Sequence, residues 1–134
     1  MRIIGFKLLK ILAERFKDPS GSIQVSTNFS IPHFEKESFK DSSGKETAFG
    51  FDFTYILKYQ EFAQIEFSGK IYAAFDKKIA KDLEKDSKDI PNDARTLLLN
   101  YILYKTHVET LHLEEKLNLP FHMDSPKVRI ETKN

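Results

Sequence analysis

Histidine and carboxylate side chains are the residues of this chain most able to do chemistry, and several of them fall in one predicted helix. A helical zinc site needs two histidines four residues apart, because that spacing puts both imidazoles on one face. His107 and His112 are five residues apart, a step that turns the helix by about 500° and leaves the rings about 140° apart. We therefore expect these histidines, with His33 and His122, at the surface or in an interface, and we expect no metal site.

Other catalytic groups also lack the spacing that their chemistry needs. Glu114 and Glu115 are adjacent, so they diverge by about 100° on a helix and are expected to face solvent rather than share a buried acid–base site. No serine lies in a G-x-S-x-G motif, and the five glycines form no phosphate-binding loop. The absence of cysteine excludes disulfides, thiolate nucleophiles and thiolate metal ligands. The sequence predicts a protein that is not an enzyme and that uses no cofactor.

The sequence is instead rich in groups for apolar contact. Between Phe49 and Tyr59 every odd-numbered residue is aromatic or leucine, an alternation that puts six large side chains on one face of a β-strand. Sheets that stack RNA bases interleave such rings with Arg and Lys. Here the opposite face mixes charges of both signs, as in Asp52 and Lys58. We do not expect nucleic acid as a partner.

Length and charge set further limits. The chain has 134 residues, a usual size for a single domain, and 31% of them are charged with a formal net charge of only +1. So small a net charge produces no overall field that would attract nucleic acid or an anionic membrane. Lys7 and Lys10 interrupt the apolar start, and no later run approaches the ~18 apolar residues of a membrane span. We expect one domain over residues 1–134, located in the cytoplasm and not inserted in a membrane.

Four segments alternate in the way that β-strands do. Arg2–Phe16 fits a helix as well as a strand, and we favour a strand. The turn-forming run Asp18–Gly21 is predicted to close a hairpin between this segment and a second strand, Ile23–Ile31. Pro32 must end that second strand or place it at a sheet edge, because proline has no N–H to donate.

The aromatic strand and the segment after it form the clearest hairpin. A tight reversal is followed by Ile65–Phe75, which alternates again, and Gly69 predicts a β-bulge or the close approach of another backbone. Before this hairpin, the polar stretch His33–Glu46 is expected to be a loop. The phenylalanines of the loop, Phe34 and Phe39, either dock on the fold or form an exposed apolar contact surface.

Two helices are predicted after the strands. Asp76 can cap a short helix that runs to about Asp86, and Pro91 begins a long helix that runs to about Glu115. The long helix carries two apolar stripes, although a helix that covers one sheet needs only one stripe of about 100°. One stripe contains Ala94, Leu97, Leu98, Tyr101, Tyr104, Val108 and Leu111, and the other contains Leu99, Ile102, Leu103 and Leu113. We interpret the surplus stripe as an oligomer interface formed by Leu99, Ile102 and Leu103.

These segments predict an α+β fold, a four-stranded antiparallel sheet with one long and one short helix packed on one face. In this order of elements, and in the residues at both ends of the long helix, the chain resembles the SecB-type and SecB-like protein-export chaperones. Their long helix also opens after a proline with an apolar run that contains an arginine, as at Pro91 and Arg95, and a leucine-proline segment follows it, as at Leu117–Pro120. The resemblance implies a homodimer or homotetramer that holds unfolded or partly folded polypeptides in long apolar grooves without ATP or metal. Some relatives of this kind guard antitoxins.

The resemblance and the apolar pattern together give a candidate surface for such clients. It is formed by rings of the loop, the start of the aromatic strand and the segment after the long helix: Phe34, Phe39, Phe49, Phe51, Leu119 and Phe121. The alternative for each of these residues is a place in the core. The alternative for the protein is a carrier of a small apolar ligand, or another non-enzymatic scaffold for protein interactions. The sequence leaves open the identity of the client and whether the role is export, antitoxin protection or general holding.

Overall fold

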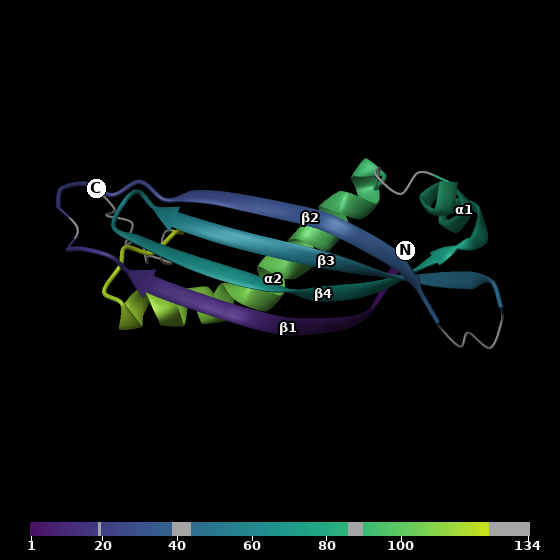
Figure 1. Ribbon diagram of the computed structural model, residues 1–134, viewed down its shortest axis with the longest axis horizontal. Coiled ribbons are helices and arrows are strands. Elements are labelled where there is room, and N and C mark those ends of the chain that lie inside the picture. Colours follow the sequence, from purple (N-terminus) through teal and green to yellow (C-terminus); the bar gives the residue numbers. More distant parts are fainter. Residues whose placement is uncertain (19, 39–43, 86–89, 124–134) are drawn as a thin grey trace, which may run out of the picture.

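One antiparallel sheet and two helices make up the part of the chain that the structure describes. The computed structural model describes residues 1–18, 20–38, 44–85 and 90–123. The four strands are β1 (Arg2–Arg15), β2 (Ser26–Glu37), β3 (Glu46–Tyr59) and β4 (Ala63–Asp76), and the helices are α1 (Lys77–Lys85) and α2 (Asn92–Lys116). The strands pair in the order β1-β4-β3-β2. Figure 1 shows α2 crossing behind the sheet at an angle to the strands, with α1 at one end.

The core lies between the sheet and the helices, on the face formed by the odd-numbered residues of β3. Phe51, Tyr55 and Tyr59 are buried there, and their pairing partners on β4 face the same way. The helices contribute Leu83 from α1 and Ile102 from α2 to this core. Both helices therefore pack on one face of a four-stranded antiparallel sheet, and the predicted α+β fold is confirmed.

The position of β1 corrects one part of the predicted topology. The segment is a strand, as favoured from the sequence, but it does not form a hairpin with β2 through Asp18–Gly21. β1 and β2 lie at opposite edges of the sheet, and β1 pairs antiparallel with β4, for example Ile11 with Phe67. Turn-forming residues indicate where a chain can change direction, but they do not determine which strand it pairs with. Here β2 pairs along β3 and β1 pairs along β4, at the two edges of the β3–β4 hairpin.

Strand β2 begins and ends later than predicted. It runs over Ser26–Glu37, so its last residues, from His33 onward, belong to the sheet and not to the predicted loop. Pro32 lies in an irregularity of the pairing between Ser30 and His33, at an edge of the sheet. This is one of the two places that the sequence allowed for the proline, since an edge strand does not need every N–H.

The ends of the helices agree with the sequence. Asp76 Oδ1 accepts a hydrogen bond of 2.9 Å from the backbone N–H of Ile79 and so caps α1 as predicted. Pro91 immediately precedes α2, and its carbonyl accepts a hydrogen bond of 2.9 Å from the backbone N–H of Arg95. A proline at this end of a helix loses nothing, because the first N–H groups of a helix have no partner within it.

The buried face of α2 winds around the helix. Its buried residues follow one another at four-residue intervals: Ala94, Leu98, Ile102, Thr106, Thr110 and Glu114. Four residues turn an α-helix by about 400°, so each buried residue lies about 40° further round than the one before. The winding agrees with the oblique crossing in Figure 1, and it exposes a different strip of the helix at each level.

Gly69 lies where the backbones of β1 and β4 come very close. It pairs with Leu8, beside a register shift between Leu8 and Lys10. A Cβ built on Gly69 would collide with the backbone carbonyl of Lys7. The close approach predicted from the sequence is confirmed.

Replacing this glycine should therefore destabilise the sheet. We expect Gly69→Ala to lower the free energy of unfolding by roughly 2 kcal/mol, because the backbone of β1 must move away from β4. Chemical denaturation measures the change. Ser68→Ala is the matched control, since it alters the neighbouring residue on the other face of β4 and should stay within about 0.5 kcal/mol. Equal stability of the two variants would contradict the prediction.

A candidate apolar site beside helix α2

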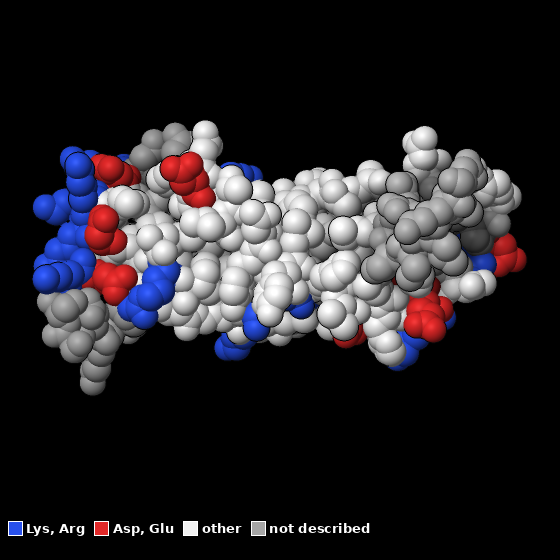
Figure 2. Space-filling model, turned by 180° about the vertical axis from the view of Figure 1, so that it is seen from behind, with Lys and Arg blue, Asp and Glu red and all other residues white. Residues whose placement is uncertain are grey.

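Exposed apolar side chains gather along α2. Tyr104 and Val108 are 75% and 76% exposed, and Leu97 and Leu103 are exposed as well. Figure 2 views the helix-bearing face and shows a broad uncharged area across its middle, with the charged residues mainly toward the ends. A continuous group of exposed apolar side chains is typical of a binding surface, whereas single ones are ordinary.

A pocket of about 420 Å³ lies beside these residues, and we call it the α2 pocket. It opens between α2 and the segment that follows it, Leu117–Met123, which we call the exit segment. Its apolar walls include Leu103, Val108 and Met123, and Tyr55 of β3 closes it on the sheet side. The volume falls within the range of roughly 300–1,000 Å³ that is usual for ligand sites.

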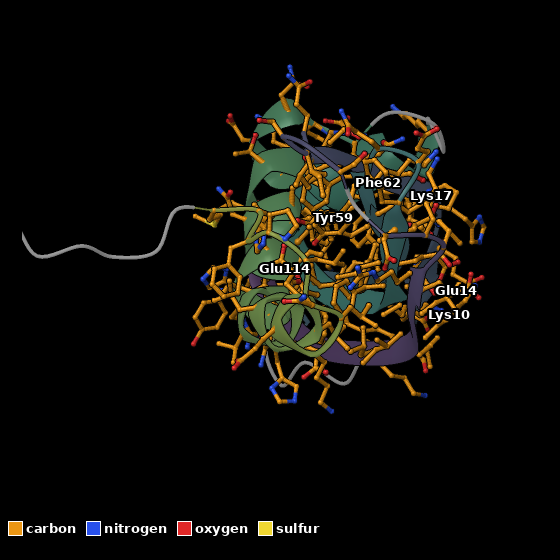
Figure 3. All side chains as sticks on the ribbon, turned by 90° about the vertical axis from the view of Figure 1, so that its left-hand side faces the viewer. Lys10, Glu14, Lys17, Tyr59, Phe62 and Glu114 are labelled. Atoms are coloured by element: carbon orange, nitrogen blue, oxygen red, sulfur yellow. The ribbon has the colours of Figure 1, made fainter. Side chains whose placement is uncertain are left out.

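Glu114 holds the exit segment against the helix. Its side chain is completely buried, and Oε2 accepts hydrogen bonds of 2.5 Å from the Tyr59 hydroxyl and of 2.8 Å from the backbone N–H of His122. Oε1 lies 2.8 Å from Nδ1 of the same histidine. Figure 3 shows Tyr59 and Glu114 meeting between α2 and the sheet. Since a buried carboxylate is costly without such partners, this cluster joins strand, helix and exit segment at one point.

Backbone contacts fix the start of the exit segment. Arg15 Nη1, from β1, donates a hydrogen bond of 2.9 Å to the carbonyl of Leu117. Asn118 has a φ of 54° and turns the chain, and the backbone N–H of Leu119 then donates to the Glu114 carbonyl at 2.8 Å. The Leu119 side chain is buried in the core. The wall of the α2 pocket is thus anchored to both the helix and the far edge strand.

Two buried threonines lie in the same part of α2. The hydroxyl of Thr106 donates to the carbonyl of Ile102, and the hydroxyl of Thr110 donates to the carbonyl of Thr106, both at 2.8 Å. These bonds to carbonyls four residues earlier allow a hydroxyl to be buried in a helix. Both threonines line the α2 pocket.

Tyr55 is a third buried side chain of the pocket that carries a hydroxyl. Its ring is 1% exposed and stacks on Phe29 with centroids 4.2 Å apart, while Phe67 lies on its other flank at 6.1 Å. Burial and then the charge of Glu114 raise the pKa of the Tyr55 hydroxyl to about 12. The pKa of Tyr59 is also raised, by burial and then by its hydrogen bond to Glu114. Both phenols are therefore protonated donors at neutral pH.

Most of the predicted client-binding residues are part of the core. Four of them are buried: Phe34, Phe49, Phe51 and Leu119. Because the expected loop continues strand β2, Phe34 pairs with Phe51 and the two rings stack with centroids 5.4 Å apart. Phe121 is 47% exposed. Phe39 lies outside the described residues.

A smaller hollow of about 210 Å³ lies near α1. Phe34 and Phe49 line it together with Leu83. Lys36 and Glu84 also line it and form an ion pair, with Nζ and Oε1 3.0 Å apart. Two of the predicted client-binding rings therefore reach a surface hollow, although both side chains are largely buried.

The residues predicted for the oligomer interface are also partly in the core and partly at the surface. Ile102 is buried in the core, and Leu99 is partly buried against it, so this stripe packs on the sheet. Leu103 is exposed and lines the α2 pocket. Leu103 directly follows Ile102 and so points about 100° away from it on the helix, which leaves the Leu103 side chain exposed while Ile102 faces the sheet. Tyr104 and Val108, in the stripe expected to cover the sheet, are exposed instead.

The sequence placed two functional residues of this site wrongly. Glu114 was expected to face solvent, and His122 to lie at the surface or in an interface. Glu114 is instead completely buried, and the His122 side chain is only 7% exposed and packs against Glu114 of the same chain. The four-residue recurrence from Ala94 to Glu114 was the available indication, since it continues the buried series. The tyrosine that meets Glu114 lies in β3, and no local pattern connects the two.

The outer edge of β1 is a second exposed apolar surface. Within the described ranges no strand pairs with it, and its exposed side chains include Leu9, at 63%, and Ile11. Figure 3 shows Lys10 and Glu14 projecting from β1 on the side away from Tyr59. A long unpaired edge with apolar side chains readily pairs with another strand, and soluble proteins normally protect such edges.

The described residues contain neither a metal-binding cluster nor a helix suited to span a membrane. In residues 1–18, 20–38, 44–85 and 90–123, no group of three or more histidine, aspartate or glutamate side chains is placed to hold a metal ion. In the same ranges, no helix combines the length and the apolar character needed to cross a membrane.

Comparisons with known proteins give a structural likeness and no sequence relative. No protein-family model matches the chain, and no curated protein matches it. One matching solved structure is a SecB-like chaperone of Mycobacterium tuberculosis in complex with a peptide from the HigA1 antitoxin. The match covers 99% of this chain and 91% of that chain, with 15% sequence identity and a TM-score of 0.41. A likeness at this level does not define the function of this chain.

Removing the Glu114 carboxylate should loosen the exit segment. We expect Glu114→Ala to lower the free energy of unfolding by about 3 kcal/mol, because the Tyr59 hydroxyl and His122 lose their buried partner. Denaturant unfolding measures the loss, with Glu115→Ala as the matched control at the adjacent exposed position. The control should change stability by less than about 0.5 kcal/mol. A loss in Glu114→Ala no larger than in the control would rule out this anchoring role.

Proposed function

We propose that this protein is a cytoplasmic, ATP-independent holdase-type chaperone that binds apolar segments of unfolded or partly folded polypeptides. The binding surface is the α2 pocket together with the exposed face of α2. The observation that carries the proposal is the exposure of Tyr104 and Val108, about three quarters of each side chain, beside a pocket of about 420 Å³ with apolar walls. Such a surface costs free energy in water unless a partner covers it.

The shape of this surface suits a chain segment. Leu97 and Val108 are eleven residues apart on α2, so the exposed strip between them is about 16 Å long. An extended polypeptide covers that distance with about five residues. Because the contacts are aromatic and aliphatic, they tolerate many client sequences.

Residues predicted from the sequence have different places in this proposal. Phe121 lies in the exit segment, and we expect its exposed ring to add to the apolar surface. Phe34 and Phe49 add the smaller hollow near α1. A role in client contact stays a prediction for all of these residues, and equally for the other three, Phe39, Phe51 and Leu119.

We also propose that two copies of the chain assemble through the β1 edge. Pairing of two β1 strands would satisfy the open edge and cover the side chains of Leu9 and Ile11, which are exposed in one copy. At the opposite edge, Pro32 interrupts the regular pairing and makes β2 a poorer template for another strand. A larger assembly through Leu103 and the exposed face of α2 would compete with client binding.

A carrier of a small apolar ligand is the second candidate. The volume of the α2 pocket favours it, since about 420 Å³ is enough for a small molecule. The open strip of α2 beside the pocket favours the chaperone. A ligand that stays bound through purification and native mass spectrometry, together with no effect on protein aggregation, would decide for the carrier.

The chaperone proposal is tested by suppression of aggregation. At stoichiometric ratios and without nucleotide, the protein should suppress aggregation of an unrelated denatured protein, as measured by light scattering. Val108→Glu should reduce the suppression severalfold, because a charge must be desolvated when a client covers this position. His112→Glu is the matched control, since it introduces the same residue at an exposed position of α2 outside the pocket. Absence of suppression by the wild-type protein would refute the proposal.

The assembly proposal is tested by sedimentation velocity. The wild-type protein should be a dimer or a larger oligomer, and the double variant Leu9→Lys, Ile11→Lys should be a monomer, because charges on an edge oppose strand pairing. The double variant Ser26→Lys, Asn28→Lys makes the same change at exposed positions of the β2 edge and should leave the oligomer intact. A monomeric wild-type protein, or dissociation by both double variants, would contradict assembly through β1.

A further inference from the structure

The hydroxyl of Tyr55 is a buried donor with no protein partner. Within the described part of the chain it makes no hydrogen bond, whereas the neighbouring Tyr59 hydroxyl is bound to Glu114. Every fully buried side-chain nitrogen or oxygen of the described residues has a partner, so the unpaired hydroxyl must reach open space. Tyr55 is only 1% exposed and lines the α2 pocket, and the open space it reaches is therefore the pocket.

This donor is held in place before any ligand arrives. The Tyr55 ring lies parallel to Phe29, with an angle of 1° between the ring planes, and Phe67 is on its other flank. A donor on a ring fixed by stacking loses little conformational freedom when it binds. The buried donor therefore favours an occupant that brings a hydrogen-bond acceptor to this point.

The walls of the pocket restrict what can carry that acceptor. Leu103, Val108 and Met123 are apolar, and the ring of Tyr104 lines the pocket as well. Aromatic groups pack favourably against rings and against the methionine thioether. The acceptor is therefore best carried on an aromatic ring.

The buried charge of Glu114 affects which charge the occupant can carry. Its Oε1 lies 2.8 Å from Nδ1 of His122, which lines the pocket, and the same carboxylate contributes to the raised pKa of the Tyr55 phenol. The same field opposes an anionic acceptor placed beside the Tyr55 hydroxyl. A neutral oxygen is favoured over a carboxylate.

We propose that the α2 pocket is a selective subsite for a neutral aromatic group that bears an oxygen acceptor, with Tyr55 donating the hydrogen bond that recognises it. In a polypeptide client, the group with this chemistry is the tyrosine side chain. The identification of the occupant as part of a client rests on the proposed chaperone function. The recognition chemistry itself depends only on the pocket.

Small aromatic probes test the subsite on the wild-type protein. Toluene and 4-methylanisole are similar in hydrophobicity and differ by a methoxy group, so only the second has an acceptor oxygen. NMR titration should show 4-methylanisole and 4-methylphenol binding about fivefold more tightly than toluene, as expected for one hydrogen bond. The anion 4-methylbenzoate should bind more weakly than 4-methylphenol. Equal affinities for toluene and 4-methylanisole would overturn the proposal.

A variant then assigns the preference to one hydroxyl. Tyr55→Phe should remove the fivefold preference and leave the affinity for toluene unchanged. Tyr72→Phe is the matched control, because Tyr72 pairs with Gly50, at an even-numbered position of β3, and lies on the face away from the pocket. A preference that survives Tyr55→Phe, or that disappears equally in both variants, would overturn the assignment.

The probe experiments and the aggregation assay can refute the subsite and the chaperone function separately. A protein that binds the probes in the expected order and yet does not suppress aggregation supports the subsite and refutes the chaperone function. A protein that suppresses aggregation but binds toluene as tightly as 4-methylanisole refutes the subsite alone.

Discussion

The oblique path of α2 across the sheet is the constraint on which the rest of the structure depends. Because the helix crosses the strands at an angle, the line of contact moves around it by about 40° every four residues. At the start of the helix this line passes through Ala94 and Leu98, and near its end it reaches Glu114. Apolar residues that lie off the line, such as Tyr104 and Val108, stay in solvent and form the exposed apolar surface that we propose for client binding.

The same winding explains why a carboxylate is buried at the end of the helix. The contact line brings Glu114 under the helix opposite Tyr59, and the cost of burying the charge is offset by bonds to this tyrosine and to His122. Those bonds also position the exit segment, which is one wall of the α2 pocket. A polar cluster in the core thus determines the shape of an apolar site on the surface.

The two edges of the sheet differ in how readily each could pair with another strand. β2 is an irregular edge, with Pro32 in the break of its pairing, and it contributes Phe34 to the core. β1 is a long edge with Leu9 and Ile11 exposed. A protein with one open apolar edge and one interrupted edge is suited to closed pairing of two copies rather than to open-ended addition of strands.

Local pattern was enough to predict the elements of this fold. Alternation located the β3–β4 hairpin and its buried face, Asp76 and Pro91 located the starts of the helices, and Gly69 located the close approach of two strands. Each of these depends on residues near one another in the sequence. The extent of β2 was misjudged because polar residues of an edge strand, such as Glu35, resemble those of a loop.

The candidate site could not be predicted from local sequence patterns. Whether β1 pairs with β2 or β4, which side of α2 meets the sheet, and which tyrosine meets Glu114 all depend on contacts between distant segments. The sequence by itself determined that the protein has a surplus of apolar and aromatic surface and a long helix to carry it. Only the tertiary structure decided which part of that surplus is buried, because the angle between helix and sheet, and not the order of residues, selects the face that the core covers.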